Sequence, residues 1–312
     1  MDLITFGLVN VPFTIVNILV NIFFISCMAC PLDGRQIKQP LKLLLGTLIC
    51  CTIIYLMSFL MHFLFFITRY SKYMLVSYLS FVYTLYTSMS SSVWLNFFFF
   101  TQIVPAKRAS FIWIKKNIKA IIYCIWFFDK LFRLFDVGTV LIDFYASRDL
   151  ILGTISYNFT MYDKTIYFQK LSSLGKSADI AFGFVKANLI ICLCVMVTSS
   201  SSTVFYLCKH MRRMVATGQP FTCSRFRSQV RVTITGILQG LLYMLVAVWS
   251  MKRYFSENVL VSGYTFIHIT VINLYMVGTT FNLGAGQSVF RHRAADIWLR
   301  AAQLLKGPSE QV

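Results

Sequence analysis

The chain has 312 residues, of which 57% are hydrophobic, 16% are aromatic and only 13% are charged, and its formal net charge is +18. That much apolar surface is too large for one water-soluble domain of this length, so the composition predicts a membrane protein whose exterior is covered by lipid. The basic charge suits anionic lipid headgroups and an acidic cytosolic partner. It argues against nucleic acid, because no basic, aromatic-interleaved soluble domain is there to hold a strand.

Seven apolar stretches follow one another along the chain, and each is long enough to cross the hydrocarbon core of a bilayer as a helix. The first could be a signal peptide, but it lacks a basic start and is longer than a usual signal-peptide core, so we interpret it as a retained span. The predicted spans are 5–29, 41–67, 75–104, 118–142, 184–208, 230–251 and 262–286. They predict an all-α membrane protein, with residues 1–286 as one seven-transmembrane domain.

Lysine and arginine are distributed unevenly between the segments that join these spans. One alternate set of segments holds more than twice as many of them as the other, and this richer set comprises 30–42, 105–119, 209–231 and 287–312. Loops rich in lysine and arginine stay on the cytoplasmic side of a membrane. We therefore expect a multi-pass protein of the plasma membrane with its N-terminus extracellular and its C-terminus cytoplasmic.

The third predicted span carries a face whose members recur at the helical spacing i, i+3, i+4, i+7 and i+8. The members are Tyr86, Met89, Ser90, Val93 and Trp94, with three further serines beside them. Such a face predicts either the wall of a ligand pocket or a close contact between helices. Small polar residues inside a span more often serve close packing, which the pattern alone favours.

The fourth predicted span contains four charged residues, Asp129, Lys130, Arg133 and Asp136. At spacings of three and four residues, Arg133 can pair with either aspartate on one helical face. One interpretation places these residues in a polar network or ligand site inside the bundle. The other, which we favour, places them in the headgroup region at the outer end of the span, because only residues 118–128 precede them in it.

The segment 143–183 is predicted to be the largest extracellular loop. It holds Asn158-Phe159-Thr160, which is the one N-x-S/T sequon in the chain. Glycosylation needs this segment on the extracellular side, where the charge asymmetry independently places it. We therefore expect Asn158 to carry a glycan.

Two cytoplasmic segments combine apolar and basic residues in a way that indicates a docking surface. One begins with Pro105-Ala-Lys107-Arg108, and the other runs from Leu207 to Met214. Basic inner loops also arise from membrane topology alone, so the basic charge by itself does not identify a docking surface.

The tail, 287–312, predicts a short amphipathic helix on the inner leaflet. One helical face would carry the apolar residues Ala294, Ile297, Trp298, Ala301 and Leu305, while Arg291, Arg293 and Arg300 lie elsewhere. Seven spans followed by an interfacial eighth helix form a more specific pattern than the basic charge.

No arrangement of residues in the sequence predicts catalysis. There are 11 acidic residues and 4 histidines, and the histidines are far apart. A nucleophile elbow, a zinc-protease helix and a phosphate-binding loop are all missing. The cysteines show no metal-binding spacing, and none falls in a predicted extracellular loop, so we expect no enzyme activity, no metal, no cofactor and no extracellular disulfide.

Three short segments carry a resemblance to a known receptor family. Leu207-Cys-Lys209-His210-Met-Arg-Arg-Met214 resembles the L-W-K-H-x-x-x-M at the end of the family's fifth helix. Residues 95–104 and 111–115 are similar to its third-helix L-x-x-F-Y-x-L-K-I-A and F-L-W-L-K, and residues 279–291 are more weakly similar to its seventh-helix H-S-x-x-L-x-x-G-N-x-x-L-R. The chain thus resembles the type 2 (bitter) taste receptors of fish, which are seven-helix G-protein-coupled receptors.

The resemblance implies a receptor for small, mostly apolar bitter compounds that activates a gustducin-type G protein, and through it phospholipase C and calcium release. The ligand would lie in the outer half of the bundle, near Tyr86, Met89, Ser90, Val93, Trp94 and His268. The surface facing the G protein would include Gln102, Lys107, Arg108, Lys209, His210, Arg212, Arg213 and Met214.

The chain departs from the family pattern where the inactive state would be latched. Cys51 stands near the position of the usual second-helix arginine, Gln102 replaces the third-helix lysine, and the sixth-helix H-x-x-A-L-K is not recognisable in residues 229–235.

Two other functions remain open from the sequence. A vomeronasal type 1 receptor would share the architecture, but the K-H-x-x-x-M segment and the missing extracellular cysteine pair favour a taste receptor. A small-molecule transporter would need matched, glycine- or proline-broken spans in two halves of the chain, and no such pairing is visible.

Overall fold

The protein is described by a computed structural model that covers residues 2–30, 39–68, 73–106, 108–155, 161–216, 224–255 and 262–306. Within these ranges the chain forms eight helices and no strand, which confirms the all-α prediction for the described residues. The helices are α1 (Leu3–Ala29), α2 (Leu41–Thr68), α3 (Met74–Ile103), α4 (Ala109–Ile155), α5 (Met161–Ala216), α6 (Ser224–Phe255), α7 (Ser262–Gly286) and α8 (Ser288–Lys306).

Five of the described helices are long and apolar enough to cross a membrane. They are α1, α2, α5 over Lys186–Ala216, α6 over Arg227–Met251 and α7 over Phe266–Gly286. The third and fourth predicted spans also form helices, but serine, threonine and asparagine lower the hydropathy of α3, and charged residues interrupt α4.

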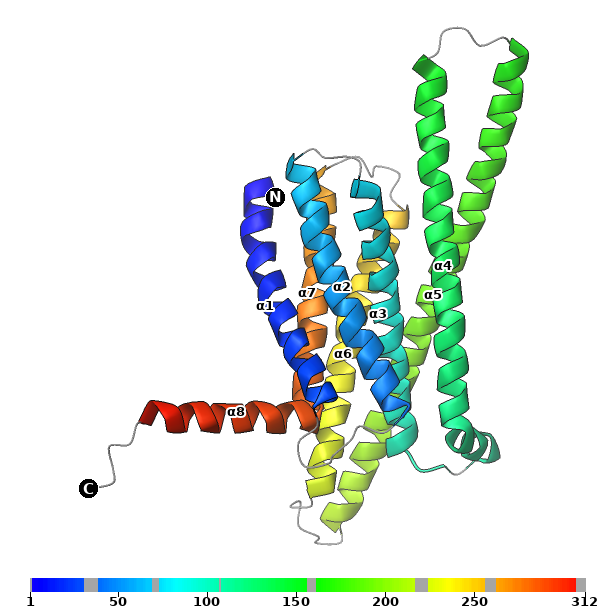
Figure 1. Ribbon diagram of the computed structural model, residues 1–312. Helices are drawn as coiled ribbons and strands as arrows, with labels where there is room; N and C mark the ends of the chain where they lie inside the picture. The colour runs from blue at the N-terminus through cyan, green and yellow to red at the C-terminus, as the bar shows by residue number, and fades with distance from the viewer. Residues whose placement is uncertain are drawn as a thin grey trace.

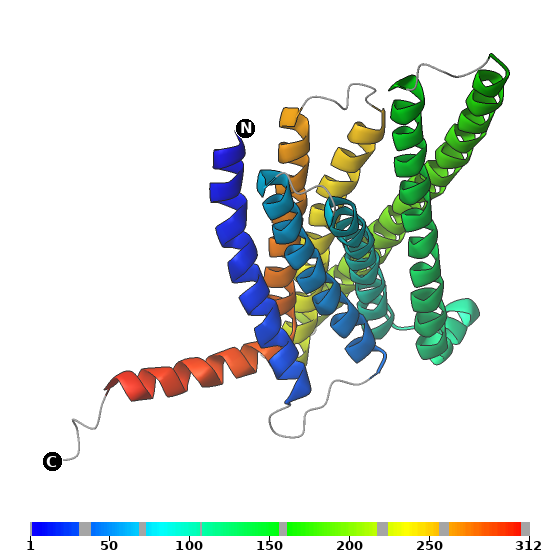
Figure 2. The same ribbon diagram turned by 45° about the horizontal axis from the view of Figure 1, so that its top comes forward.

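The helices form an elongated bundle with α3 at its centre. α3 packs against α2, α4, α5 and α6, while α1 packs against α2 and α7. In Figures 1 and 2, α4 and α5 lie on the side of the bundle away from α1. The N-terminus and α8 lie at opposite ends of the bundle, so the predicted inner ends of the spans share one end with α8 (Figure 1).

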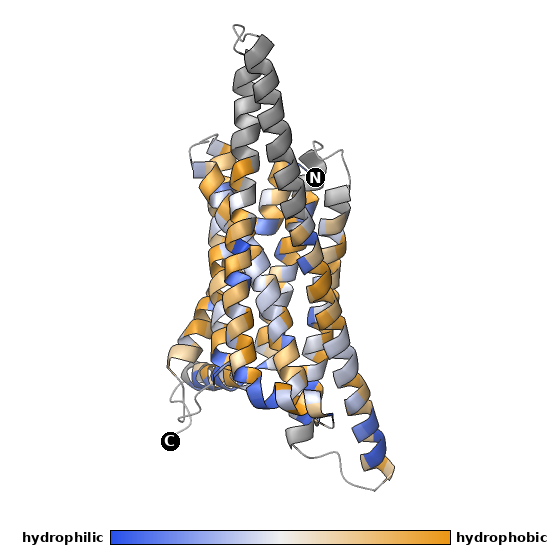
Figure 3. Cartoon of the chain, turned by 90° about the vertical axis from the view of Figure 1, so that its right-hand side faces the viewer, coloured by the Kyte–Doolittle hydropathy of each residue, from blue (hydrophilic) through white to orange (hydrophobic). Residues whose placement is uncertain are grey.

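The bundle has polar residues inside and apolar residues outside, which is the reverse of a soluble helical protein. α1 buries four polar side chains on one face, at Asn10, Thr14, Asn17 and Asn21, while Leu8 and Leu19 are 72% and 61% exposed. Hydrophobic residues, coloured orange in Figure 3, also make up much of the coloured helices. An exterior of this kind is stable only in an apolar solvent, which agrees with the predicted membrane location.

Two buried apolar clusters hold the bundle together. The central cluster joins α2, α3, α5, α6 and α7, with Tyr55, Met89 and Tyr243 among its members. The inner cluster joins α1, α2, α3, α4 and α7 to the start of α8, where the rings of Phe24 and Phe290 stack with centroids 4.3 Å apart.

The segment 143–183, which was predicted to be the largest extracellular loop, is helical throughout its described residues. α4 is 47 residues long and continues to Ile155, and α5 is 56 residues long and begins at Met161. At 1.5 Å per residue these helices are about 70 Å and about 84 Å long, well beyond a hydrocarbon core of about 30 Å. Hydropathy measures only the part of a helix that lies in lipid, and a helix can continue into water with polar residues.

The described part of the tail is helical over Ser288–Lys306, as expected. α8 packs against α1 and α7 and points away from the bundle axis in Figure 1. Trp298 is 75% exposed, and Ile297 and Leu299 are also exposed. Exposed apolar side chains on a helix at the end of the bundle are consistent with the predicted position on a membrane surface.

Candidate functional site

One cavity lies between α3, α4, α5 and α6, and we call it the Arg133 cavity. It has about 220 Å³ of empty space and is lined by Tyr86, Met89, Ser90, Arg133, Asn188, Leu189, Cys192 and Tyr243. α3 contributes the first three of these residues because helical spacing puts positions 86, 89 and 90 on one face. Four helices thus meet around this space.

The structure separates the six residues that the sequence analysis proposed for ligand binding. Tyr86, Met89 and Ser90 line the Arg133 cavity. Val93 is fully buried in the central cluster, and Trp94 packs edge-on against Phe97 beside the inner cluster.

His268 has a different setting on α7. Its Nε2 lies 3.5 Å from the Ser250 hydroxyl of α6, and it is not among the residues that line the Arg133 cavity. The structure therefore brings together three of the six proposed residues.

Asp129 and Arg133 of α4 lie inside the bundle, and the favoured headgroup interpretation is wrong for these two residues. Asp129 is 9% exposed and Arg133 is 4% exposed. The Nη2 atom of Arg133 lies 3.5 Å from Asp129 Oδ1, and Lys130 Nζ lies 3.6 Å from Asp129 Oδ2. The pairing of oppositely charged neighbours reduces the free energy of burying them. The side chain of Asp136 lies outside the described residues.

Aromatic rings support both cations of this group. Arg133 Cζ lies 5.4 Å from the centroid of the Tyr86 ring, and Lys130 Nζ lies 5.6 Å from the Trp126 ring. The negative face of an aromatic ring attracts a cation, and a planar guanidinium also stacks on it. The ring of Tyr86 thus orients Arg133 at the wall of the cavity.

Polar groups line the cavity beside its apolar wall. The buried Ser90 hydroxyl has no hydrogen-bond partner among the described residues. Cys192 Sγ donates to Asn188 Oδ1 at 3.2 Å, and the Tyr243 hydroxyl donates to the Leu189 carbonyl at 3.4 Å. A buried hydroxyl without a partner is uncommon, because leaving it unpaired costs about 1–3 kcal/mol.

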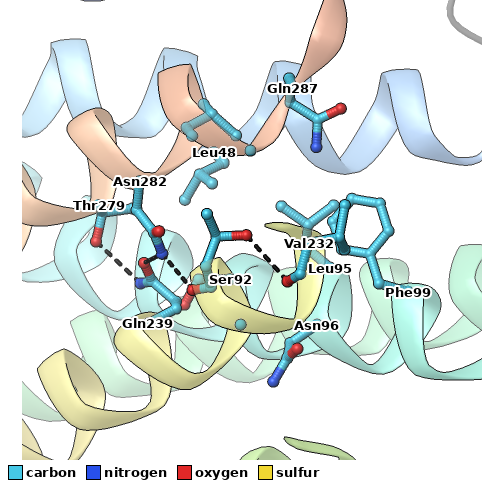
Figure 4. Close-up of a pocket in the computed structure, with 14 residues that line it drawn as sticks. Leu48, Ser92, Leu95, Asn96, Phe99, Val232, Gln239, Thr279, Asn282 and Gln287 are labelled. Carbon is cyan, nitrogen blue, oxygen red and sulfur yellow. Dashed lines mark hydrogen bonds between the residues drawn. The ribbon is translucent and has the colours of Figure 1, made fainter. Parts of the chain in front are cut away.

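A second cavity, the Gln239 cavity, lies nearer to α8 and has about 400 Å³ of empty space. Its walls come from α2, α3, α6 and α7 and from the residue that follows α7. Its lining residues are Leu48, Ser92, Leu95, Asn96, Phe99, Val232, Thr235, Gly236, Gln239, Thr279, Asn282, Leu283, Gly286 and Gln287. Figure 4 shows Gln239, Thr279 and Asn282 together on one side of this cavity.

A hydrogen-bond network joins three helices along that side. Gln239 Nε2 donates to the Thr279 hydroxyl at 2.9 Å and to the Tyr275 hydroxyl at 3.3 Å. Asn282 Nδ2 donates to Gln239 Oε1 at 3.1 Å and to the Thr235 carbonyl at 2.6 Å. The Ser92 hydroxyl lies 3.0 Å from that of Tyr275, so the network ties α6 to α7 and α7 to α3.

Gln239, Tyr275 and Asn282 are not among the residues predicted from the sequence to form a site. A signal for Gln239 and Asn282 was available, because amide side chains are expensive inside a span unless they find partners. The partners themselves lie on other helices and have no fixed spacing in the sequence.

The residues expected to face a G protein gather at the end of the bundle that carries α8. Gln102, Arg108, Lys209, Arg212 and Arg213 are exposed, while His210 and Met214 are partly buried. Lys107 lies outside the described residues, and so does Asn158. Cys51, the position of one departure from the family pattern, is buried in α2.

The described side chains do not form a metal centre, because no three of the His, Cys, Asp and Glu side chains among them lie close enough to share an ion.

Comparison with known families returns one finding that covers nearly the whole chain. Residues 2–301 match the family model described as Taste receptor protein (TAS2R), a range that includes all of α1 to α7. No curated protein sequence matches the chain.

Proposed function

The chain belongs to the taste receptor protein (TAS2R) family of G-protein-coupled receptors, and from this premise we propose that it detects small, mostly apolar bitter compounds in the Arg133 cavity. The family is one of receptors and not of enzymes, which confirms the expectation that the chain is not an enzyme. The family match also favours a taste receptor over a vomeronasal type 1 receptor or a transporter.

The observation that carries the proposal is the convergence of four helices on the Arg133 cavity. Tyr86, Met89 and Ser90 come from α3, and the facing residues come from α4, α5 and α6. A ligand that contacts several helices at once can bind one arrangement of the bundle more tightly than another. Such a differential affinity is what a receptor needs to convert binding into a signal.

We further propose that α1 to α7 all cross the membrane, with the N-terminus outside and α8 on the inner leaflet. α3 supports this reading because it is packed against four other helices, so its serines face protein and not lipid. α4 supports it because Asp129 and Arg133 are buried against neighbouring helices. The excess of lysine and arginine at the α8 end supports this orientation.

The signal would leave the receptor at the α8 end of the bundle. The exposed basic residues Lys209, Arg212 and Arg213 at the end of α5 suit an acidic partner surface. A gustducin-type G protein, acting through phospholipase C and calcium release, is the partner that the family implies.

Calcium imaging tests the proposal in cells that express the receptor with a suitable G protein. A panel of bitter compounds should raise cytosolic calcium only in cells that carry both proteins. Tyr86→Ala, at the cavity, should shift the concentration response. Tyr78→Ala, on the exposed face of the same helix, should not.

The proposal fails if receptor that has reached the cell surface stays silent across a broad panel. Substrate uptake that needs no G protein would instead indicate a transporter.

A further inference from the structure

We propose that α8 binds anionic phospholipids of the inner leaflet, such as phosphatidylserine, and that Arg291 holds the phosphate of one of them. This inference rests on the proposed position of α8 at the membrane surface. That position alone needs only an apolar face, whereas a preference for anionic lipid needs cations at defined places on the helix.

The first argument is the direction of the apolar face of α8. Phe290, near the start of the helix, is 1% exposed, because its ring stacks on that of Phe24 in α1. Residues four, seven and eleven positions after Phe290 lie on the same side of the helix. These residues, Ala294, Ile297 and Ala301, are exposed, so none of the described segments covers them. The face that begins at α1 therefore continues along the bilayer without a protein partner.

The second argument is the distribution of charge around α8. At about 3.6 residues per turn, Arg291 lies at one edge of the apolar face, and Arg293 and Arg300 lie at the other edge. Asp296 and His292 lie on the opposite side of the helix, away from the apolar face. Arginines at the edges of an apolar face reach the lipid headgroups while their stems cover apolar surface. The cations are thus placed at headgroup level, and the acid is not.

The third argument is that Arg291 lacks a counter-ion. Its Nε and Nη1 atoms are buried without a hydrogen-bond partner, and neither ion pair found among the described residues includes it. Burial of a charge without a partner is costly, so an arginine in this state calls for an anion. The side chain is half-buried, so part of it remains open at the surface. An anion that binds there would neutralise the charge.

A phospholipid headgroup supplies such an anion. A guanidinium binds two phosphate oxygens through parallel hydrogen bonds, and the acyl chains of the same lipid would cover the apolar face beside Trp298, which is 75% exposed. A soluble anion would leave this face uncovered. Phosphatidylcholine also carries a phosphate, but its choline cation cancels the net charge. Anionic lipids are a feature of the cytoplasmic leaflet, which is the side proposed for α8.

Lipid titration of the whole receptor tests the inference. Receptor purified in a neutral detergent is titrated with dioleoyl phosphatidylserine or dioleoyl phosphatidylcholine, and native mass spectrometry counts the bound lipid. We expect phosphatidylserine to bind at about tenfold lower concentrations, because each basic residue near an anionic surface contributes about fivefold. Glycerophosphoserine, which has the same headgroup and no acyl chains, should not displace the bound lipid.

Variants then assign the preference to the arginines of α8. Arg291→Gln should reduce the preference for phosphatidylserine about fivefold, and Arg291→Lys should retain part of it. Arg300→Gln, at an exposed position, should also reduce the preference, and it tests the inference even if Arg291→Gln does not fold. Arg227→Gln is the matched control and should leave the preference unchanged, because Arg227 is exposed near the start of α6, which extends beyond α8 in Figure 1.

Trp298→Ala separates the apolar contribution from the charge. It should weaken the binding of both lipids by a similar factor and leave the preference between them intact. Unaltered binding of both lipids in this variant would contradict the proposed position of α8 on the membrane.

Three results would overturn the inference itself. One is equal binding of the two lipids by the wild type, and another is an equal loss of both lipids in Arg291→Gln, which would mean that Arg291 only supports the fold. The third is displacement of the lipid by glycerophosphoserine at the concentration at which intact lipid competes, which would indicate a site for a soluble anion. The proposed receptor function stands in all three cases, because the calcium response to bitter compounds tests it separately.

Discussion

Replacement of Gln239 by leucine tests whether the network beside the Gln239 cavity holds the receptor in its resting state. Gln239 is buried in α6 and makes three hydrogen bonds to α7, through Tyr275, Thr279 and Asn282. Leucine is similar in size but has no polar atom, so Gln239→Leu removes all three bonds with little change in packing. Tyr275 keeps its contact with Ser92, and Asn282 keeps its bond to Thr235.

The expected effect is about 2 kcal/mol. Hydrogen bonds between membrane helices average about 0.6 kcal/mol each, and three of them link Gln239 to α7. If these bonds exist only in the resting arrangement, their loss shifts the equilibrium towards the active arrangement by a factor of about 30. Basal signalling should therefore rise while the resting protein becomes less stable.

Two measurements check this prediction: the basal G-protein signal, corrected for receptor at the cell surface, and the unfolding temperature of the purified receptor in detergent. Gln303→Leu, the same substitution at an exposed position of α8, is the matched control and should change neither. An unaltered unfolding temperature in Gln239→Leu would refute the energetic reasoning. A lower temperature with an unaltered basal signal would show that the network stabilises both states equally.

Three further predictions concern other parts of the chain. Gly236→Ala should lower the unfolding temperature, because its Cβ would come 2.7 Å from Asn96 Oδ1, whereas Gly240→Ala meets nothing closer than 3.6 Å; equal temperatures for the two variants would contradict the steric argument. Asn158→Gln should abolish a glycosidase-sensitive shift on a gel, and a shift that persists would contradict the topology. Arg212→Glu should reduce the calcium response to an agonist without reducing surface expression; a wild-type response would exclude this residue from the G-protein surface.

Helix positions were the most predictable part of the fold. The predicted spans 5–29, 41–67 and 75–104 agree within two residues with α1, α2 and α3, because the length of an apolar run is set by the thickness of the bilayer. The lengths of α4 and α5 were not predictable in this way. Their extensions beyond residue 142 and before residue 184 are not apolar, so they leave no mark in hydropathy.

In the third helix, the spacing of residues in the sequence predicted part of the site but not all of it. The pattern from Tyr86 to Trp94 identified one face of α3, and Tyr86, Met89 and Ser90 on that face do line the Arg133 cavity. Val93 and Trp94 continue the face towards the α8 end and pack against other helices. Spacing along a helix predicts the direction in which a side chain points, but it contains no information on the depth at which a cavity lies.

For the buried charges of α4, the sequence predicted the pairing but not the location of the pair. Their i, i+4 spacing correctly indicated that Asp129 and Arg133 could pair. Whether such a pair lies in headgroups or in the bundle depends on what the other helices present at the same depth, and here that is the ring of Tyr86 on α3. An arginine on the lipid-facing side of a span would be drawn towards the membrane surface, whereas one that lies over a ring inside the bundle can stay at a cavity wall. One side chain that contacts Arg133 thus belongs to a different helix, so neither the charges of the fourth span nor its apolar length could reveal this contact.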